Sequence, residues 1–347
     1  MPTYRAMIAS PLEAEHIERI REHLPENVEL IYEPDLYPPT TYIADHHGPD
    51  DWSRTEEQEA RWRQLAASAD ILFDFPVGRV HPHSYAPNVK WVQTTSAGIG
   101  QAVARMGVKP GELIITTASG IHSRPLAEFV FMVLLIWVKC APQLMADKQA
   151  RHWQRFCSDE LSGKTLAIVG PGRIGREIAR ISRAFDMRPV AVARDTRPER
   201  AAELGVERLY ERSELKDMLA TADAVVICAP HTPETENMMG AAEFDALKPG
   251  VVFINIGRGT LVDEDALLAK LTDGTIAFAG LDVFRNEPLP SDSRFWELPN
   301  VIINPHSAST SDRENGRVTD LFIHNLSCFV DGRIDEMRNV LDVERMY

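Results

Sequence analysis

Residues 165 to 175 read TLAIVGPGRIG, and this run determines which fold the chain can adopt. Its first five residues, of which all but Thr165 are apolar, predict a buried strand, and a helical pattern begins at the last glycine. Gly170 permits a tight turn, Gly172 lets a phosphate approach backbone N–H groups, and Gly175 lets the helix pack closely on the sheet. Such glycines also occur as plain turn residues. The strand–turn–helix context favours a dinucleotide site.

The same alternation of apolar run and helical stretch repeats from Lys164 to Asn304, which is typical of a parallel α/β sheet. The predicted strands are Thr165–Val169, Pro189–Ala193, Ala224–Ala229, Val251–Ile256, Ile276–Leu281 and Val301–Asn304. The predicted helices include Ile174–Phe185, one capped by Ser213, and one that begins at Asp263 and ends at Gly274.

The first hundred residues alternate on a smaller scale and predict a second α/β unit, with apolar runs at Ala6–Ala9, Val28–Tyr32, Ile71–Phe75 and Trp91–Thr94. An apolar helix after Arg124 bridges the two units, and a helix from Ser311 to Val330 returns the chain to the first. We therefore expect two doubly wound, parallel-sheet domains of the Rossmann and flavodoxin-like kind. Residues 1–118 and 312–347 form one, residues 119–311 form the other, and the active site lies in the cleft between them.

A Pro- and His-rich stretch from Pro34 to Asp51 precedes a polar helix through Arg61 and is interpreted as an inserted surface excursion within residues 34–64. A plain solvated loop is favoured over a lid above the substrate. The sequence leaves the role of this insertion open.

The chain has 347 residues, 44% of them hydrophobic and 25% charged, which suits two folded domains. Its net charge of −14 opposes phosphate backbones and anionic lipid, so neither nucleic acid nor membrane is an expected partner. The longest apolar run, Phe129 to Val138, is shorter than the ~18 residues of a spanning helix. Met1 to Ser10 does not resemble a secretory signal, and we expect a cytoplasmic protein.

The cysteines are widely spaced and form no metal-type pair, so we expect free thiols that pack rather than react, at Cys140, Cys157, Cys228 and Cys328. No metal is expected.

Five motifs together resemble the D-isomer-specific 2-hydroxyacid dehydrogenase family, and within it the glyoxylate and hydroxypyruvate reductases. They are Glu160–Thr165, Pro230–Thr235, Asn255–Glu264, Leu281–Pro288 and Asn304–His306. The resemblance extends from Ala6 to Val330. It implies an NAD(P)-dependent enzyme that transfers a hydride between nicotinamide C4 and the 2-carbon of a small 2-hydroxy or 2-keto acid.

Reduction of a 2-keto acid needs a cation for the carboxylate and a proton donor for the carbonyl oxygen. Arg258 lies between two glycines after an apolar strand, where its guanidinium can hold a carboxylate bidentately and polarise the carbonyl. His306 follows the last strand, and an imidazole suits proton transfer near neutral pH. Glu287 is its natural partner, because a carboxylate favours the charged ring and fixes its tautomer. Alone, the histidine would more often be structural and the glutamate a solvated loop charge. Together with Arg258 and the glycine loop, in the family's order, they are the predicted catalytic residues.

The resemblance also implies a set of cofactor contacts: Gly170, Gly172, Arg173, Ile174, Gly175, Ala229, Pro230, Thr235, Ile256, Gly257 and Asp282. Asp282 would accept from the nicotinamide carboxamide, although a turn aspartate explains it equally well. The substrate carboxylate would meet backbone N–H groups of Ser96, Ala97, Gly98 and Ile99. The chain departs from the family at Gly100, where an acidic residue is common. His122 and Arg124 either face the cleft or cap the apolar helix.

An acidic side chain normally grips the ribose 2′-OH at the end of the second strand of this fold. That position falls at Ala193 here, followed by Arg194, with Arg197 close behind. A guanidinium can bind a 2′-phosphate, so NADP(H) is favoured over NAD(H). Asp195 keeps the alternative open, because a shift of two positions would restore an NAD preference.

Two other functions are disfavoured. Formate dehydrogenase has no need of the proton relay that Glu287 and His306 imply, and a nucleotide-sensing corepressor of related fold would use the site for binding alone. The substrate stays open, with glyoxylate and hydroxypyruvate first and no basic cluster to mark a phosphate pocket. The apolar helix and the segment Arg151–Phe156, centred on Trp153, predict a homodimer interface.

Overall fold

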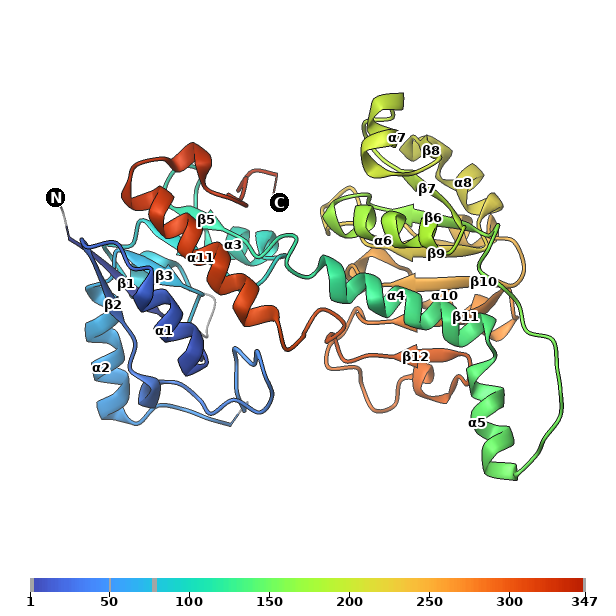
Figure 1. Ribbon diagram of the computed structural model, residues 1–347, viewed down its shortest axis with the longest axis horizontal. Coiled ribbons are helices and arrows are strands. Elements are labelled where there is room, and N and C mark those ends of the chain that lie inside the picture. Colours follow the sequence, from blue (N-terminus) through green and yellow to red (C-terminus); the bar gives the residue numbers. More distant parts are fainter. Residues whose placement is uncertain (1–2, 50, 77–79, 346–347) are drawn as a thin grey trace. The chain divides into compact units, whose positions relative to one another are not determined.

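The computed structural model describes residues 3–49, 51–76 and 80–345. The chain forms two compact units, Met1–His122 with Thr310–Tyr347, and Ser123–Ser309 (Figure 1). The first unit contains β1 (Tyr4–Ile8), α1 (Ala14–Glu22), β2 (Val28–Ile31), η1 (Pro34–Leu36), α2 (Glu56–Ala67), β3 (Ile71–Phe73), η2 (Pro82–Ser84), β4 (Trp91–Gln93), α3 (Gly100–Met106), β5 (Ile114–Thr116), α11 (Glu314–Val330) and η6 (Ile334–Glu336).

The second unit is one continuous segment. It contains α4 (Ser123–Val138), α5 (Ala141–Ala150), β6 (Thr165–Val169), α6 (Arg173–Ala184), β7 (Arg188–Val192), α7 (Pro198–Leu204), β8 (Arg208–Tyr210), η3 (Arg212–Glu214), α8 (Leu215–Thr221), β9 (Ala224–Ile227), α9 (Ala241–Asp245), β10 (Val251–Asn255), η4 (Gly259–Leu261), α10 (Glu264–Thr272), β11 (Ile276–Leu281), η5 (Arg294–Glu297) and β12 (Val301–Ile303).

The sheet of the first unit is parallel throughout and has the strand order β2-β1-β3-β4-β5. Its central strands β3 and β4 are buried along their whole length because helices cover both faces of the sheet. α11, from the far end of the chain, lies beside α1 and covers one face (Figure 1). Phe322 of α11 stacks on Trp91 and meets Phe73 edge-on, with ring centroids 5.3 Å apart in both pairs. The first unit is therefore completed by the C-terminal segment.

The sheet of the second unit is also parallel, in the order β12-β11-β10-β9-β6-β7-β8. α4 and α6 pack on one face, and α8, α9 and α10 pack on the other. The chain reverses its direction of winding between β6 and β9, which lie side by side. In a doubly wound sheet this switch point is where ligands bind, beyond the carboxyl ends of the strands. The predicted fold class of two parallel α/β domains is confirmed.

The strands at residues 165–169 and 276–281 have the predicted bounds, and the other four predicted strands of the second unit differ by one or two residues. Two three-residue strands, β5 and β8, were not predicted. The predicted helix cap at Ser213 is wrong. Ser213 lies inside η3, where Glu211 and Glu214 form a reciprocal capping box, and α8 begins only at Leu215.

The stretch from Pro34 to Asp51 is not a plain solvated loop. It buries five residues, Leu36, Tyr37, Pro38, Ala44 and Asp45, while Asp50 lies outside the described residues. Burial acts to raise the pKa of Asp45, but hydrogen bonds from the backbone N–H groups of Thr41, Gly48 and His47 lower that pKa to about 2. The insertion is therefore held by its own buried carboxylate.

Among the described residues no single helix is long and apolar enough to cross a membrane. The pair α4 and α5 meets that length and composition together, but it is bent by 58° and α4 is largely buried in the core of the second unit.

The close packing of α4 on β11 in the core of the second unit can be tested by substituting a glycine at the contact. A Cβ added at Gly280 would lie 2.5 Å from Cγ2 of buried Val133. Gly280→Ala is expected to lower the free energy of unfolding by about 1–3 kcal/mol, because the core must shift to admit the methyl group. Gly316→Ala is the control. Its Cβ would lie 3.5 Å from the His16 ring, and alanine favours a helix, so thermal unfolding should be unchanged or slightly later. Equal melting temperatures for Gly280→Ala and the unsubstituted protein would contradict this packing argument.

Candidate active site

The glycine loop leaves β6 and enters α6 as a cradle open on one side. Gly170 has φ +97°, and a Cβ there would lie 2.5 Å from the backbone of Ala229. A Cβ on Gly175 would lie 2.9 Å from the carbonyl oxygen of Gly170, so this glycine allows α6 to approach the loop. A Cβ on Gly172 would meet nothing within 4 Å. The open space lies at the N-terminus of α6, where Arg173 and Ile174 form the first turn and N–H groups favour an anion. The loop therefore fits a dinucleotide pyrophosphate.

The loop after β9 borders the glycine loop at the switch point. The Cys228 thiol donates to the carbonyl oxygen of Gly170 at 3.1 Å, and burial raises the pKa of this thiol to about 12. Thr235 Oγ1 donates to the carbonyl oxygen of Pro230 at 2.9 Å and accepts from the Thr232 N–H at 2.7 Å. Cys228 is thus a neutral packing group, and Thr235 holds the loop that contains Ala229 and Pro230.

Charged residues follow the end of β7, the strand that pairs with β6 beside the glycine loop. The strand ends at Val192, and Arg194 forms an ion pair with Glu234 at 2.7 Å, in which both side chains are exposed. The carboxylate of Asp195 accepts from the Arg197 guanidinium at 2.7 and 2.9 Å, and these hydrogen bonds lower the pKa of Asp195 to about 2. Both arginines predicted to meet the cofactor are therefore paired with carboxylates.

Arg258 lies directly after β10 in a loop that Asn255 holds from both sides. The Asn255 amide donates to the carbonyl oxygen of Arg258, and its oxygen accepts from the Gly257 N–H, both at 3.1 Å. A Cβ on Gly259 would lie 1.9 Å from the carbonyl carbon of Phe284, so the loops after β10 and β11 touch through this glycine. Ile256 and Gly257 are buried.

Burial lowers the pKa of Arg258, while the charges of Glu287 and Asp282 oppose that shift. Asn255 belongs to a motif that the sequence analysis singled out, but its role in holding this loop was not predicted.

His306 and Glu287 form a hydrogen-bonded pair, with 2.8 Å between Nδ1 and Oε2. His306 lies just beyond β12 with φ +54°, and its N–H donates to the carbonyl oxygen of Asp282 at 2.9 Å. The other oxygen of Glu287 accepts from the Phe284 N–H at 2.9 Å. Burial acts to raise the pKa of Glu287, but hydrogen bonds from His306 and Phe284 and the charge of Arg258 lower it below its ordinary value. The carboxylate thus stays ionised and orients the imidazole.

Asp282 is 2% exposed, and its Oδ1 accepts from the Asn304 amide at 2.6 Å and from the Ala308 N–H at 3.0 Å. These contacts link the end of β11 to the residues around His306. Arg258, Glu287 and His306 therefore all follow carboxyl ends of strands in the seven-stranded sheet that also carries the glycine loop.

The predicted substrate loop belongs to the first unit, where it follows β4. The carbonyl oxygen of Ser96 accepts from the Thr94 hydroxyl at 2.7 Å and from the Ala118 N–H at 3.1 Å. Ala97 and Gly98 come next, and Ile99 is the residue before α3. The structure thus orders this loop within the first unit and does not relate it to the residues of the second.

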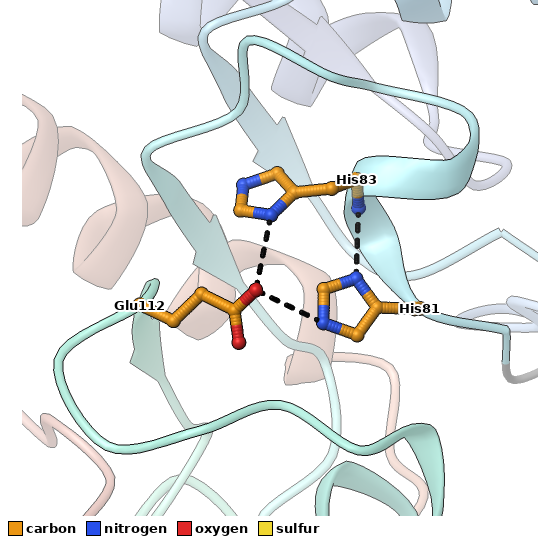
Figure 2. Close-up of side chains that lie close together, drawn as sticks. All are labelled: His81, His83 and Glu112. Atoms are coloured by element: carbon orange, nitrogen blue, oxygen red, sulfur yellow. Dashed lines mark hydrogen bonds and ion pairs between the residues drawn. The ribbon is translucent and has the colours of Figure 1, made fainter.

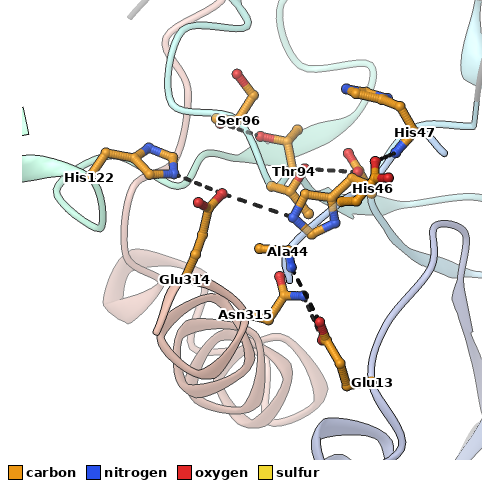
Figure 3. Close-up of polar contacts among 12 residues, drawn as sticks. Glu13, Ala44, His46, His47, Thr94, Ser96, His122, Glu314 and Asn315 are labelled. Atoms are coloured by element: carbon orange, nitrogen blue, oxygen red, sulfur yellow. Dashed lines mark hydrogen bonds and ion pairs between the residues drawn. The ribbon is translucent and has the colours of Figure 1, made fainter. Parts of the chain in front are cut away.

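A buried acid–histidine cluster in the first unit was not predicted (Figure 3). Glu314, the first residue of α11, lies 3.1 Å from Nε2 of His122 and 3.9 Å from Nε2 of His46 in the insertion. All three side chains are nearly buried. His122 therefore holds the start of α11, a role that was not among the two left open for it, while Arg124 pairs on the surface with Glu177 and Glu128. No sequence signal joins residues so far apart.

The fold and the glycine loop define a dinucleotide-binding α/β protein. The family model of the D-isomer specific 2-hydroxyacid dehydrogenase, NAD binding domain, matches residues 131–308, just over half of the chain. D-3-phosphoglycerate dehydrogenase of Mycobacterium tuberculosis is 35% identical over 299 residues, covering 82% of this chain and 55% of that protein. Glyoxylate reductase of Aeropyrum pernix is 32% identical over 282 residues, covering 78% of this chain and 82% of that protein.

A solved structure of a D-isomer specific 2-hydroxyacid dehydrogenase family protein from Aeromonas salmonicida is 28% identical, with a TM-score of 0.81 over 98% of this chain and 99% of that chain. This chain belongs to the D-isomer-specific 2-hydroxyacid dehydrogenase family, as its motifs suggested. It spans about half the length of the mycobacterial relatives that it matches.

Proposed function

We propose that the chain is an NAD(P)-dependent reductase of a small 2-keto acid, or a dehydrogenase of the corresponding D-2-hydroxy acid. The observation that carries this proposal is the 2.8 Å pair of His306 and Glu287, at the same edge of the sheet as Arg258 and the glycine loop. A bound nicotinamide cofactor would supply or accept the hydride. The residues of the chain then have to hold the substrate and move one proton.

Arg258 is assigned to the substrate carboxylate and to polarisation of the neighbouring carbonyl. Its guanidinium can bind a carboxylate bidentately, and because the fold already partly buries it, it loses less hydration on binding than an exposed guanidinium would. His306 uses Nδ1 for Glu287, so Nε2 is assigned as the nitrogen that gives its proton to the carbonyl oxygen in reduction and takes it back in oxidation. Before reduction, the ionised Glu287 stabilises the protonated imidazole from which the proton is donated.

Other assigned contacts come from family likeness. The backbone of Ser96, Ala97, Gly98 and Ile99 is assigned to the substrate carboxylate. Asp282 is assigned to the carboxamide through Oδ2, because Oδ1 already accepts two hydrogen bonds.

A panel of 2-keto acids, each assayed with NADH and with NADPH, tests the proposal. Glyoxylate and hydroxypyruvate are the substrates expected first, since a glyoxylate reductase is among the relatives covered over most of their length. A phosphorylated keto acid is included because of the phosphoglycerate dehydrogenase relatives. Steady cofactor oxidation with at least one acid is expected. Tight cofactor binding with no turnover on any acid would instead favour a nucleotide sensor.

The cofactor is proposed to be NADPH, and Arg194 is the residue assigned to its 2′-phosphate. Arg194→Ala is expected to lower the ratio of kcat/KM for NADPH over NADH by about tenfold or more, because a charge-assisted hydrogen bond is worth about 1.5–3 kcal/mol. Glu234→Gln should raise that ratio, since it removes the carboxylate that pairs with Arg194. An unsubstituted protein that prefers NADH, unaffected by Arg194→Ala but impaired by Asp195→Ala, would reverse the assignment.

A homodimer is proposed through α5 and the segment that follows it. Trp153 is 97% exposed and Met145 is 67% exposed, and α5 has no buried residue. An apolar surface of this kind is typical of a two-fold interface. Light scattering at micromolar concentration is expected to give twice the chain mass, and Trp153→Glu with Met145→Glu should give the monomer mass. A monomer in the unsubstituted protein would rule the interface out.

A further inference from the structure

Two histidines and a glutamate of the first unit meet at one point, outside every contact assigned above. His81 and His83 flank Pro82 in the connection from β3 to β4, and Glu112 lies in the connection from α3 to β5. Their ligand atoms all lie within 4.8 Å of one another, the one such group of three among the residues that the structure describes. Figure 2 shows both imidazole rings facing the same carboxylate oxygen.

The spacing of these atoms fits a bound ion better than direct ion pairs. Nε2 of His81 lies 3.3 Å and Nδ1 of His83 lies 3.4 Å from Oε1 of Glu112. A charge-assisted hydrogen bond between such groups would be about 2.7–2.9 Å long. Ligands bound at ~2.0–2.1 Å around a tetrahedral zinc ion are separated from one another by about 3.3 Å. The two distances therefore match the edge of a metal tetrahedron.

The hydrogen bonds around the cluster also orient ligand atoms toward its centre. Nε2 of His83 lies 3.0 Å from the carbonyl oxygen of Val89, which can only accept, so this nitrogen carries the proton. In the neutral ring, Nδ1 then directs its lone pair at Glu112, the arrangement in which a backbone carbonyl fixes a metal-binding histidine. Oε2 of Glu112 is occupied by the Lys109 N–H at 2.9 Å, which leaves Oε1 to the histidines.

His81 needs a change of tautomer. Its Nδ1 accepts from the His83 N–H at 3.3 Å, longer than the ordinary range of about 2.7–3.2 Å. When Nε2 binds an ion, the proton moves to Nδ1 and this long contact is given up. The exchange replaces a weak contact with a metal bond.

We propose that His81, His83 and Glu112 bind a divalent transition-metal ion, with Zn²⁺ as the type case and water completing the tetrahedron. Two imidazoles and one carboxylate suit zinc, cobalt or nickel, whereas magnesium and calcium prefer oxygen ligands alone. The ion would join two connections at the edge where β4 and β5 begin. The loop Ser96–Ile99 follows the opposite end of β4, so the ion stabilises the first unit and does not act on the substrate. The sequence had led us to expect no metal.

The test uses the full chain, stripped with a chelator and dialysed, and then titrated with ZnCl₂, CoCl₂ or MgCl₂. At a free Zn²⁺ concentration about 100-fold above its dissociation constant, the melting temperature should rise on the order of 5 °C. Co²⁺ should bind with the visible absorption of a tetrahedral site, and Mg²⁺ should have no effect. Equilibrium dialysis should find one Zn²⁺ per chain that depends on this cluster.

Matched variants identify the site. His83→Gln and Glu112→Gln should each lose that ion, the rise in melting temperature and the cobalt absorption, while keto-acid reduction stays unchanged. His23→Gln removes an exposed histidine at the end of α1, whose Nδ1 hydrogen bonds with the carbonyl oxygen of Arg19, and it should keep all three signals. His306→Asn should keep them too, which separates this site from the imidazole–carboxylate pair of the active site. An absent Zn²⁺ effect in the unsubstituted protein, or an equal effect in His83→Gln and Glu112→Gln, would overturn the proposal.

Discussion

Replacing His306 with Asn is expected to lower kcat for keto-acid reduction by about 10²–10⁴, the range that general acid catalysis contributes. Asparagine keeps a polar side chain of similar reach but cannot give up a proton near neutral pH. The dissociation constant for NADPH should change little, because the proposed cofactor contacts lie in the glycine loop and at the end of β7. Single-turnover kinetics and cofactor titration by fluorescence measure the two effects separately.

Glu287→Gln is the companion substitution. Its fall in kcat should be smaller than that of His306→Asn, because the proton donor His306 remains. The lowered pKa of Glu287 keeps its carboxylate ionised through neutral and mildly acidic pH, so titration of Glu287 should not shape the rate between about pH 6 and 8. His23→Asn, at an exposed histidine that ends α1, should leave the rate unchanged. A His306→Asn protein with near-normal kcat at pH 7 would mean that the proton comes from another group.

Arg258→Lys is expected to lower kcat/KM by about 10²–10³, with a rise in KM as well as a fall in kcat. Lysine keeps the charge but loses the planar fork, which we propose to contact the carboxylate in the ground state and to polarise the carbonyl in the transition state. The loop should keep its conformation, because Asn255 holds it through backbone atoms of residues 257 and 258 that the substitution does not change. Steady-state kinetics over a wide range of keto-acid concentration separates the two parameters.

Arg294→Lys is a suitable control, because Arg294 is exposed in η5 and has no assigned contact with substrate or cofactor. It should have no effect on either parameter. If Arg258→Lys changed kcat alone, leaving KM unaltered, the guanidinium would act only in the transition state and the carboxylate would be held elsewhere.

The parallel sheet of the second unit was predictable because its signals are local. Each strand is a short apolar run, and the glycine loop needs only its own eleven residues, Thr165–Gly175, to specify strand, turn and helix. Arg258, Glu287 and His306 could be named because each follows a predicted strand within a family motif. The contact between His306 and Glu287, 19 positions apart, could be expected because both follow neighbouring strands of one parallel sheet.

The rest depends on contacts that no local pattern contains. β5 and β8 have three residues each and are defined by pairing with β4 and β7. The insertion looked solvated because its composition is polar, yet backbone N–H groups satisfy Asp45 and allow it to be buried. The cluster of His46, His122 and Glu314 combines three distant segments. His81 and Glu112 lie 31 positions apart, and only the adjacent starts of β4 and β5 bring them together.

The dependence of the first unit on α11 bears on how the chain folds while it is being synthesised. The second unit is continuous and can close as soon as its last strand has left the ribosome. The first cannot, because Trp91 and Phe73 are covered by Phe322, about 200 residues beyond the end of the N-terminal segment. At roughly 5–20 residues per second, that apolar face stays uncovered for about 10–40 s. We therefore expect the segment that is translated first, about a third of the chain, to become native last, and its uncovered apolar face is the surface that a chaperone would bind.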